Sequence, residues 1–196
     1  MCIRDRFRFD NSFFNISARE AMSMDPQQRI LIEEAYHCIE DSGVPLNSLK
    51  ERVTSIHVGA AGNDYGQYAY SMESETDSFA NQGNYTCVLA NRLSYIFGFC
   101  GKSIAIDAAC ASSLVALNDA TRSVENFESD YAVAAGVSLA LHPRRYISMS
   151  GSRMLSPDGV CRTFDKDSNG FVPGEGVGVL LLQRLEDAIK DGNHIY

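Results

Sequence analysis

A cysteine stands between a predicted strand and a predicted helix, where it could act as a nucleophile. Residues 103–107 alternate polar and apolar side chains, which predicts a short strand. From Ala111 onward apolar residues recur at helical spacing, which predicts a helix to about Asn126. Cys110 therefore lies at the amino end of a helix, where unpaired N–H groups and the helix dipole stabilise an anion by ~0.3–1 kcal/mol. Because the reactive form of cysteine is the thiolate, this position favours nucleophilic chemistry.

The same residues also fit other roles. A free cysteine is among the most buried residue types, and small side chains on both sides of Cys110 suit a tight junction between strand and helix. A helix terminus activates a thiol only in part, and a histidine usually completes the activation. A cysteine hydrolase or thioesterase using His142 or His57 as its base therefore stays open, as does a non-catalytic interaction module in which Cys110 only packs.

Three stretches of the chain resemble one family. The stretch DAACASSL around Cys110 resembles the active-site motif of the β-ketoacyl synthases (ketosynthases), which has Thr and Ser where Ala108 and Ala111 stand. Residues 13–43 and 155–192 resemble two further stretches of the family, in the same order. Within these stretches, the sequences MDPQQR and VPGEGVG are most similar to the ketosynthases of modular polyketide synthases.

The resemblance implies a thiolase-like layered α/β fold, in which two related halves each carry a mixed sheet with flanking helices. By this comparison residues 7–196 are most of the N-terminal half, truncated at both ends, and residues 1–6 are a candidate non-native leader. The pattern itself agrees in part, because alternating strands and helices predict right-handed crossovers and a sheet with parallel strands. We expect one domain.

The resemblance also implies a reaction. In the family an acyl chain passes from the phosphopantetheine of an acyl carrier protein to the cysteine, here Cys110, whose own N–H forms part of the oxyanion hole. Decarboxylation of a malonyl-carrier then gives an enolate that attacks the acyl group. The catalytic histidines and lysine lie in the second half, so the fragment is expected to be inactive in condensation. No cofactor is expected, and family members form homodimers through the strand that here runs from Lys102 to Asp107.

Composition limits the partners and the compartment. The formal net charge is −8 and the pI is near 4.9, which argues against binding to nucleic acid or to an anionic membrane. The sequence contains no apolar run of membrane-spanning length and no signal-peptide pattern, so we expect a cytoplasmic protein. Six scattered cysteines show no metal-ligand spacing and are expected to be reduced.

The remaining elements follow from periodicity and from capping residues. A helix is predicted to begin at Asp25 as N-cap and Pro26, with Gln28 closing a capping box, and to end at Gly43. Its buried stripe excludes His37, which is expected to be solvated or packed. Further predictions are strands at 53–59, 131–139 and 174–182, the start of another strand at 194–196, helices at 85–97 and 183–190, and a polar loop at 62–84.

One loop imitates a calcium site. Asp165, Asp167 and Asn169 copy the first half of an EF-hand loop, but Glu175 falls one place before the position of the bidentate ligand. We therefore interpret these residues as a tight loop ordered by bonds from side chains to the backbone, and Glu175 as a structural acid.

Overall fold

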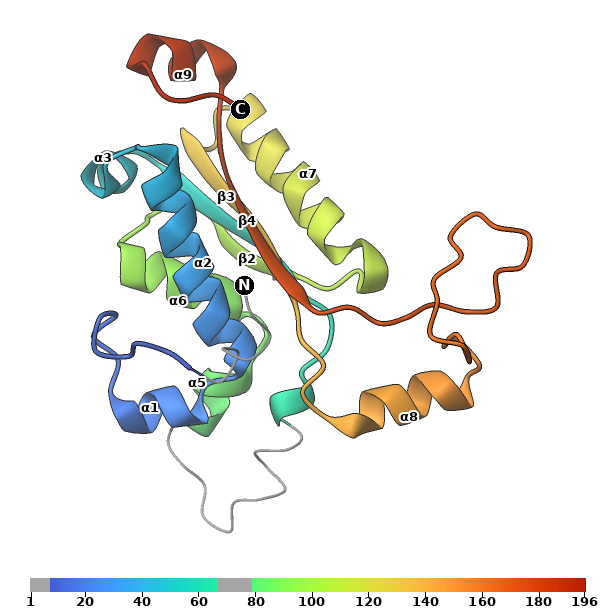
Figure 1. Cartoon of the computed structure of the whole chain (residues 1–196). Helices are drawn as coiled ribbons and strands as arrows, with labels where there is room; N and C mark the ends of the chain where they lie inside the picture. Colours follow the sequence, from blue (N-terminus) through green and yellow to red (C-terminus); the bar gives the residue numbers. More distant parts are fainter. Residues whose placement is uncertain (1–7, 67–78) are drawn as a thin grey trace.

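A four-stranded sheet in the order β2-β1-β3-β4 forms the centre of the protein. The structure, a computed structural model, describes residues 8–66 and 79–196 (Figure 1). β1 pairs in parallel with β2 and β3, and β4 pairs antiparallel with β3, so the prediction of a mixed sheet is confirmed. Each strand lies within two residues of its predicted range: β1 (Thr54–Gly59), β2 (Ser103–Ile106), β3 (Tyr131–Ser138) and β4 (Gly176–Gln183).

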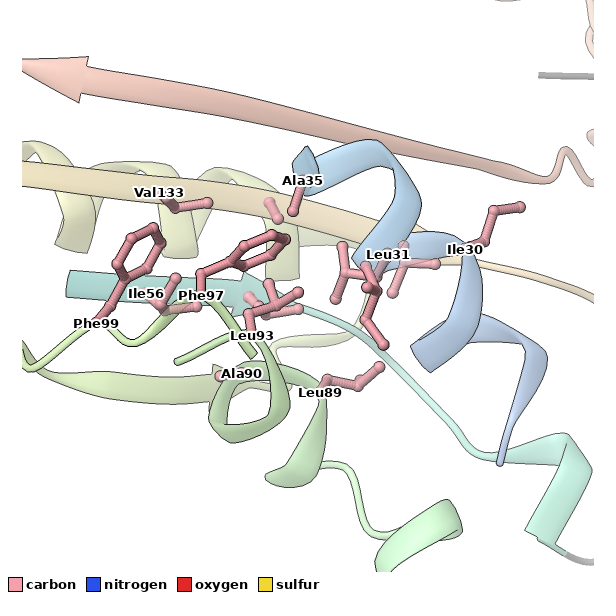
Figure 2. Packing of buried hydrophobic residues seen from close by; sticks show 14 of the residues in the cluster. Ile30, Leu31, Ala35, Ile56, Leu89, Ala90, Leu93, Phe97, Phe99 and Val133 are labelled. Carbon is pink, nitrogen blue, oxygen red and sulfur yellow. The ribbon is translucent and has the colours of Figure 1, made fainter. Parts of the chain in front are cut away.

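Three helices cover the two faces of this sheet. α2 (Pro26–Ser42) and α6 (Val88–Phe97) lie on one face and α7 (Ser112–Glu125) on the other (Figure 1). Because side chains alternate along a strand, Ile56 of β1 points to the α2 and α6 side, while His57 points to α7. Figure 2 shows Ile56 and Val133 packed with apolar side chains of α2 and α6. This face of the sheet carries the main core.

The smaller helices surround this framework. They are α1 (Ala18–Ser23), α3 (Leu46–Glu51), α5 (Ala80–Asn84), the 3₁₀ turn η2 (Ala109–Ala111), α8 (Pro143–Gly151) and α9 (Leu185–Asp191). None of the helices in the described residues is long and apolar enough to span a bilayer.

The start of α2 confirms most of its predicted signals and corrects one. Asp25 caps the helix by accepting a hydrogen bond from the Gln27 N–H at 2.7 Å, and Gly43 ends it with φ of 68°. The predicted capping box is wrong, because the Asp25 N–H already donates to the Gly83 carbonyl at 2.8 Å. The Gln28 side chain instead donates to the carbonyl of Gln82. Contacts with the distant residues Gln82 and Gly83 therefore replace the part of the cap that was predicted for Gln28.

Three other boundaries differ from the predictions. The helix predicted at 85–97 begins only at Val88, and the predicted loop at 62–84 ends in helix α5. Asn84 closes α5 through its side-chain amide, which donates to the Ala80 carbonyl at 2.7 Å, so tertiary packing replaces weak local propensity here. Residues 67–78 of that predicted loop lie outside the described residues. Residues 194–196 are not a strand, because no neighbouring strand pairs with them in the described chain.

Candidate active site

Cys110 lies in the 3₁₀ turn η2, directly between the end of β2 and the start of α7. Its side chain is exposed. An open cavity of about 810 Å³ lies beside it, lined by Cys110, by Leu117 of α7 and by Gly136 and Gly178 of the neighbouring strands β3 and β4. The predicted position of Cys110 at a strand–helix junction is confirmed. The alternative, in which Cys110 is only a buried packing residue, does not fit its exposure.

Two polar side chains fix the backbone of this turn. Asp107 accepts the Ala109 N–H at 3.0 Å through Oδ1. The Ser112 hydroxyl accepts the Ala108 N–H at 2.9 Å and donates to the Ala109 carbonyl at 2.7 Å. Because Ser112 is buried and holds both sides of the turn, the turn forms without hydroxyl groups at Ala108 and Ala111.

The residue before Cys110 has an unusual backbone conformation. Ala109 has φ of 51°, in the left-handed region that residues with a Cβ rarely adopt. Such a conformation costs on the order of 1–3 kcal/mol and persists only where surrounding bonds impose it. Here the bonds from Asp107 and Ser112 on either side of Ala109 impose it. The strained turn lifts Cys110 out of the line of β2 and places it at the cavity.

Close packing between α7 and the sheet fixes how near the turn lies to strands β1 and β3. A Cβ added to Gly59 would lie 2.4 Å from the carbonyl carbon of Ser112, and one added to Gly136 would lie 2.7 Å from Cβ of Ser113. Real Cβ atoms do not approach other atoms so closely, so only glycine fits under the first turn of α7. Both glycines thus bring the amino end of α7, and Cys110 with it, against the ends of β1 and β3.

A second feature of the turn is the backbone N–H of Cys110. Among the hydrogen bonds of the described residues, none uses the Cys110 N–H as donor. An N–H beside a nucleophile, aimed at the site where an oxyanion forms, stabilises the transition state by ~2.7–4 kcal/mol when the site is dry. The turn therefore places an exposed thiol and an N–H without a partner in the described chain next to each other.

Neither candidate histidine base serves Cys110. His57 is fully buried, and its two ring nitrogens contact Asp119 Oδ2 at 2.8 Å and Ser55 Oγ at 3.0 Å. Burial lowers the pKa of His57, which holds the ring neutral. His142 instead caps α8, accepting the Arg144 N–H at 3.1 Å. The structure thus gives no support to a cysteine hydrolase built on either residue.

The other residues singled out in the sequence have structural roles. The His37 side chain is mostly exposed, as predicted. Glu175 accepts the Ala140 N–H at 2.7 Å and so holds the segment that follows β3. Asp165 accepts the Asp167 N–H at 2.8 Å, as expected for a tight loop. The described residues contain no cluster of acids, histidines and cysteines that could hold a metal ion.

Sequence reasoning missed the residues that shape the turn. Ser112, Ala109, Gly59 and Gly136 were not predicted as part of the site. A weak signal existed, because two predicted strands carry a glycine near their carboxyl ends, where a helix crossing a parallel sheet can approach closely. His57 was considered as a base, but its pairing with Asp119 could not be seen.

Comparisons with known proteins agree on one family. The family model described as "Beta-ketoacyl synthase, N-terminal domain" matches residues 1–188. The chain is 44% identical over 191 residues to the hybrid PKS-NRPS synthetase apdA of Emericella nidulans, covering 97% of this chain and 5% of that protein. It is 43% identical over 187 residues to a phenolphthiocerol/phthiocerol polyketide synthase of Mycobacterium tuberculosis, covering 95% of this chain and 10% of that protein.

Solved structures show the same fold. The ketosynthase from module 6 of the bacillaene synthase of Bacillus subtilis 168 matches with a TM-score of 0.89 and 43% identity, covering 100% of this chain and 33% of that chain. The oxazolomycin ketosynthase domain OzmH KS7 of Streptomyces albus JA3453 matches with a TM-score of 0.87 and 36% identity, covering 97% and 33%. The expected thiolase-like fold is confirmed, and the chain spans about a third of these ketosynthase structures.

Proposed function

Because the chain belongs to the β-ketoacyl synthase family, we propose that Cys110 is the nucleophile that accepts an acyl chain from the phosphopantetheine arm of an acyl carrier protein. The supporting observation is the geometry of the turn: the thiol is exposed at an open cavity, and the adjacent Cys110 N–H has no partner in the described chain. The chain is thereby proposed to be part of a polyketide ketosynthase, in keeping with its relatives.

The proposed transfer is an exchange of one thioester for another. The Cys110 thiolate attacks the acyl carbonyl carbon, and the new C–S bond leaves an oxyanion beside the Cys110 N–H. The oxyanion collapses, the bond to the pantetheine sulfur breaks, and that sulfur leaves as a thiolate that takes up a proton. The acyl chain then remains on Cys110. Neither step requires a cofactor, since the substrate arrives already activated as a thioester.

The complete ketosynthase reaction has a second step. A malonyl-carrier loses carbon dioxide, and the resulting enolate attacks the acyl carbon and releases the Cys110 thiolate. We propose that the groups for this decarboxylation are not in this chain, because none of its four histidines lines the cavity at Cys110. The chain by itself is then expected to be acylated without condensing.

The proposed partner copy pairs through strand β2. Within residues 8–66 and 79–196, β2 is an edge of the sheet, so no strand there pairs with the outer side of its backbone. The Ile56 N–H donates to the Lys102 carbonyl and the Ala60 N–H to the Ile106 carbonyl, so the even-numbered residues of β2 face β1. The N–H of Ala105 then faces outward. We propose a homodimer through residues 102–107, in the cytoplasm. Ala105→Pro, which removes the outward N–H, should give monomers by sedimentation, while Ala105→Gly, which keeps that N–H, should remain a dimer.

Acylation can be tested on the full chain. The protein is incubated with a hexanoyl N-acetylcysteamine thioester, and the adduct mass is located on the peptide that carries Cys110. We expect a stable adduct of one acyl group per chain, absent in Cys110→Ala, and no release of free hexanoic acid beyond the uncatalysed rate. Repeated turnover to the free acid would instead indicate a hydrolase. A folded sample without any adduct would reject the nucleophile.

A further inference from the structure

A contact between a buried histidine and a half-buried aspartate joins helix α7 to the middle of the sheet. His57 lies within β1, its side chain is fully buried, and its Nδ1 lies 2.8 Å from Oδ2 of Asp119 on α7. The two residues are 62 positions apart in the sequence. The same Asp119 oxygen lies 2.8 Å from Nζ of Lys102, next to β2. Neither His57 nor Asp119 lines the cavity at Cys110.

We propose that His57 and Asp119 are positioning residues, which fix α7 along its axis on the sheet and so set the place of the Cys110 thiol and N–H at the amino end of that helix. This inference rests on the proposed function of Cys110 as the acyl-accepting nucleophile.

The packing of α7 explains why such a pair is needed. The buried face of α7 consists largely of small residues, namely Ser112, Ala116, Ala120 and Ser123. It rests on equally small residues of β3, Ala132 and Ala134. Small side chains interlock little, so they bring the helix close to the sheet without strongly resisting a slide along it. A directional hydrogen bond in the middle of the helix supplies that resistance.

The protons of the pair can be assigned. Asp119 is held ionised, because the hydrogen bond from Lys102 lowers its pKa. A neutral His57 then donates from Nδ1 to Asp119, and its Nε2 accepts from the Ser55 hydroxyl at 3.0 Å. Lys102 adds less, since its contact with Asp119 is between partly exposed side chains. The charged groups facing the ring are Asp119 and Lys102, with Glu128 farther away.

The position of α7 matters for chemistry at Cys110. The amides of its first turns stabilise the thiolate only when they point at the sulfur, and the effect fades within one helical turn. Misplacement of a reacting group by about 1 Å can cost 10²-fold in rate. Release of the helix from His57 should therefore slow reactions of Cys110, although neither His57 nor Asp119 lines the cavity at Cys110.

Alkylation by iodoacetamide tests this on the full chain, without any acyl transfer. The Cys110 thiolate forms a C–S bond and iodide leaves, and the rate is read by mass spectrometry of the Cys110 peptide. Asp119→Leu and His57→Phe should slow this rate about fivefold at pH 7, the equivalent of about 1 kcal/mol. The difference should shrink at high pH, where every thiol is ionised. The rate at Cys161, outside α7, is the internal reference.

Two variants separate positioning from general damage. Asp119→Asn should restore most of the rate, because its amide oxygen can still accept from His57 Nδ1. Asn118→Leu places the same side chain at an exposed neighbour of Asp119 and should match the wild type. All rates are compared at a temperature where circular dichroism shows every variant to be folded.

The inference is overturned if Asp119→Leu alkylates Cys110 within twofold of the wild type, or if Asn118→Leu slows it equally. Long-range ¹H–¹⁵N correlations on the wild type give an independent reading and should place the His57 proton on Nδ1. A proton on Nε2 alone would also overturn the inference. Failure of the proposed function looks different: Cys110 would then respond to these variants in alkylation, yet form no adduct with the thioester.

Discussion

Gly59 of β1 and Gly136 of β3 are direct partners in the parallel pairing, and the first turn of α7 rests on both. The same row continues to Gly178 of β4, which pairs with Gly136. Only the first two lie under α7, since a Cβ at Gly178 would meet no atom within 4 Å. All three glycines line the cavity at Cys110.

Replacing Gly59 should disturb the site through the backbone. In Gly59→Ala the new Cβ would lie 2.4 Å from backbone atoms of Ser112 and Ser113, so the first turn of α7 must move. Overpacking of this kind costs typically ~1–3 kcal/mol. We expect urea denaturation to show that loss and Cys110 alkylation to slow.

Gly178→Ala is the matched control for this substitution. It adds the same methyl group in the same row of the sheet, where nothing lies within 4 Å. Its stability should stay within ~0.5 kcal/mol of the wild type. Equal destabilisation by both substitutions would show that the contact with Ser112 is unimportant.

Ser112 should be the most important hydroxyl of the turn. Ser112→Ala leaves the Ala108 N–H and the Ala109 carbonyl without their partner. Loss of such a buried hydroxyl costs ~1–3 kcal/mol, to be measured by chemical denaturation. Ser113→Ala, at an exposed position next to it, serves as the control and should be near neutral. If the two variants are equally stable, the bonds at Ser112 do not hold the turn.

The backbone of Ala109 should tolerate glycine and reject branched side chains. Ala109→Val places a β-branched residue at φ of 51° and should lose ~1–3 kcal/mol of stability. Ala109→Gly should be near neutral or more stable, because glycine adopts this φ freely. Ala111→Val, at φ of −92°, is the control on the other side of Cys110. A thermal shift of the same size at both positions would argue against strain at Ala109.

The buried imidazole should make the protein sensitive to mild acid. Burial lowers the pKa of His57 below its ordinary value of 6.5, so below pH 6.5 the unfolded chain binds a proton that the folded chain resists. The stabilisation is complete above pH 6.5 and is lost as the pH falls through the folded-state pKa. In His57→Phe the urea midpoint should change less with pH than in the wild type between pH 6.5 and about 4.5, a range above the pKa of ordinary carboxylates.

His37→Gln is the control for that titration, because the His37 side chain is mostly exposed. Its midpoint should follow the wild type across the same range. A His57→Phe variant that kept the acid sensitivity of the wild type would locate the responsible group elsewhere.

The sequence by itself determined what neighbouring residues can determine. The cap at Asp25, the stop at Gly43 and the strand–turn–helix around Cys110 depend on groups only a few positions apart, so they were predictable. The alternation of strands and helices also determined that the sheet would contain parallel strands. The family followed from motifs that are contiguous in the chain.

Tertiary structure decided the rest, because the remaining contacts join residues far apart in sequence. The strand order, the fit of Gly59 under Ser112 and the pairing of His57 with Asp119 all depend on how α7 packs on the sheet. Gln28 illustrates the same limit, since the Asp25 N–H that it was predicted to accept donates to the carbonyl of the distant Gly83. Sequence periodicity does not predict such contacts, because it depends only on residues a few positions apart.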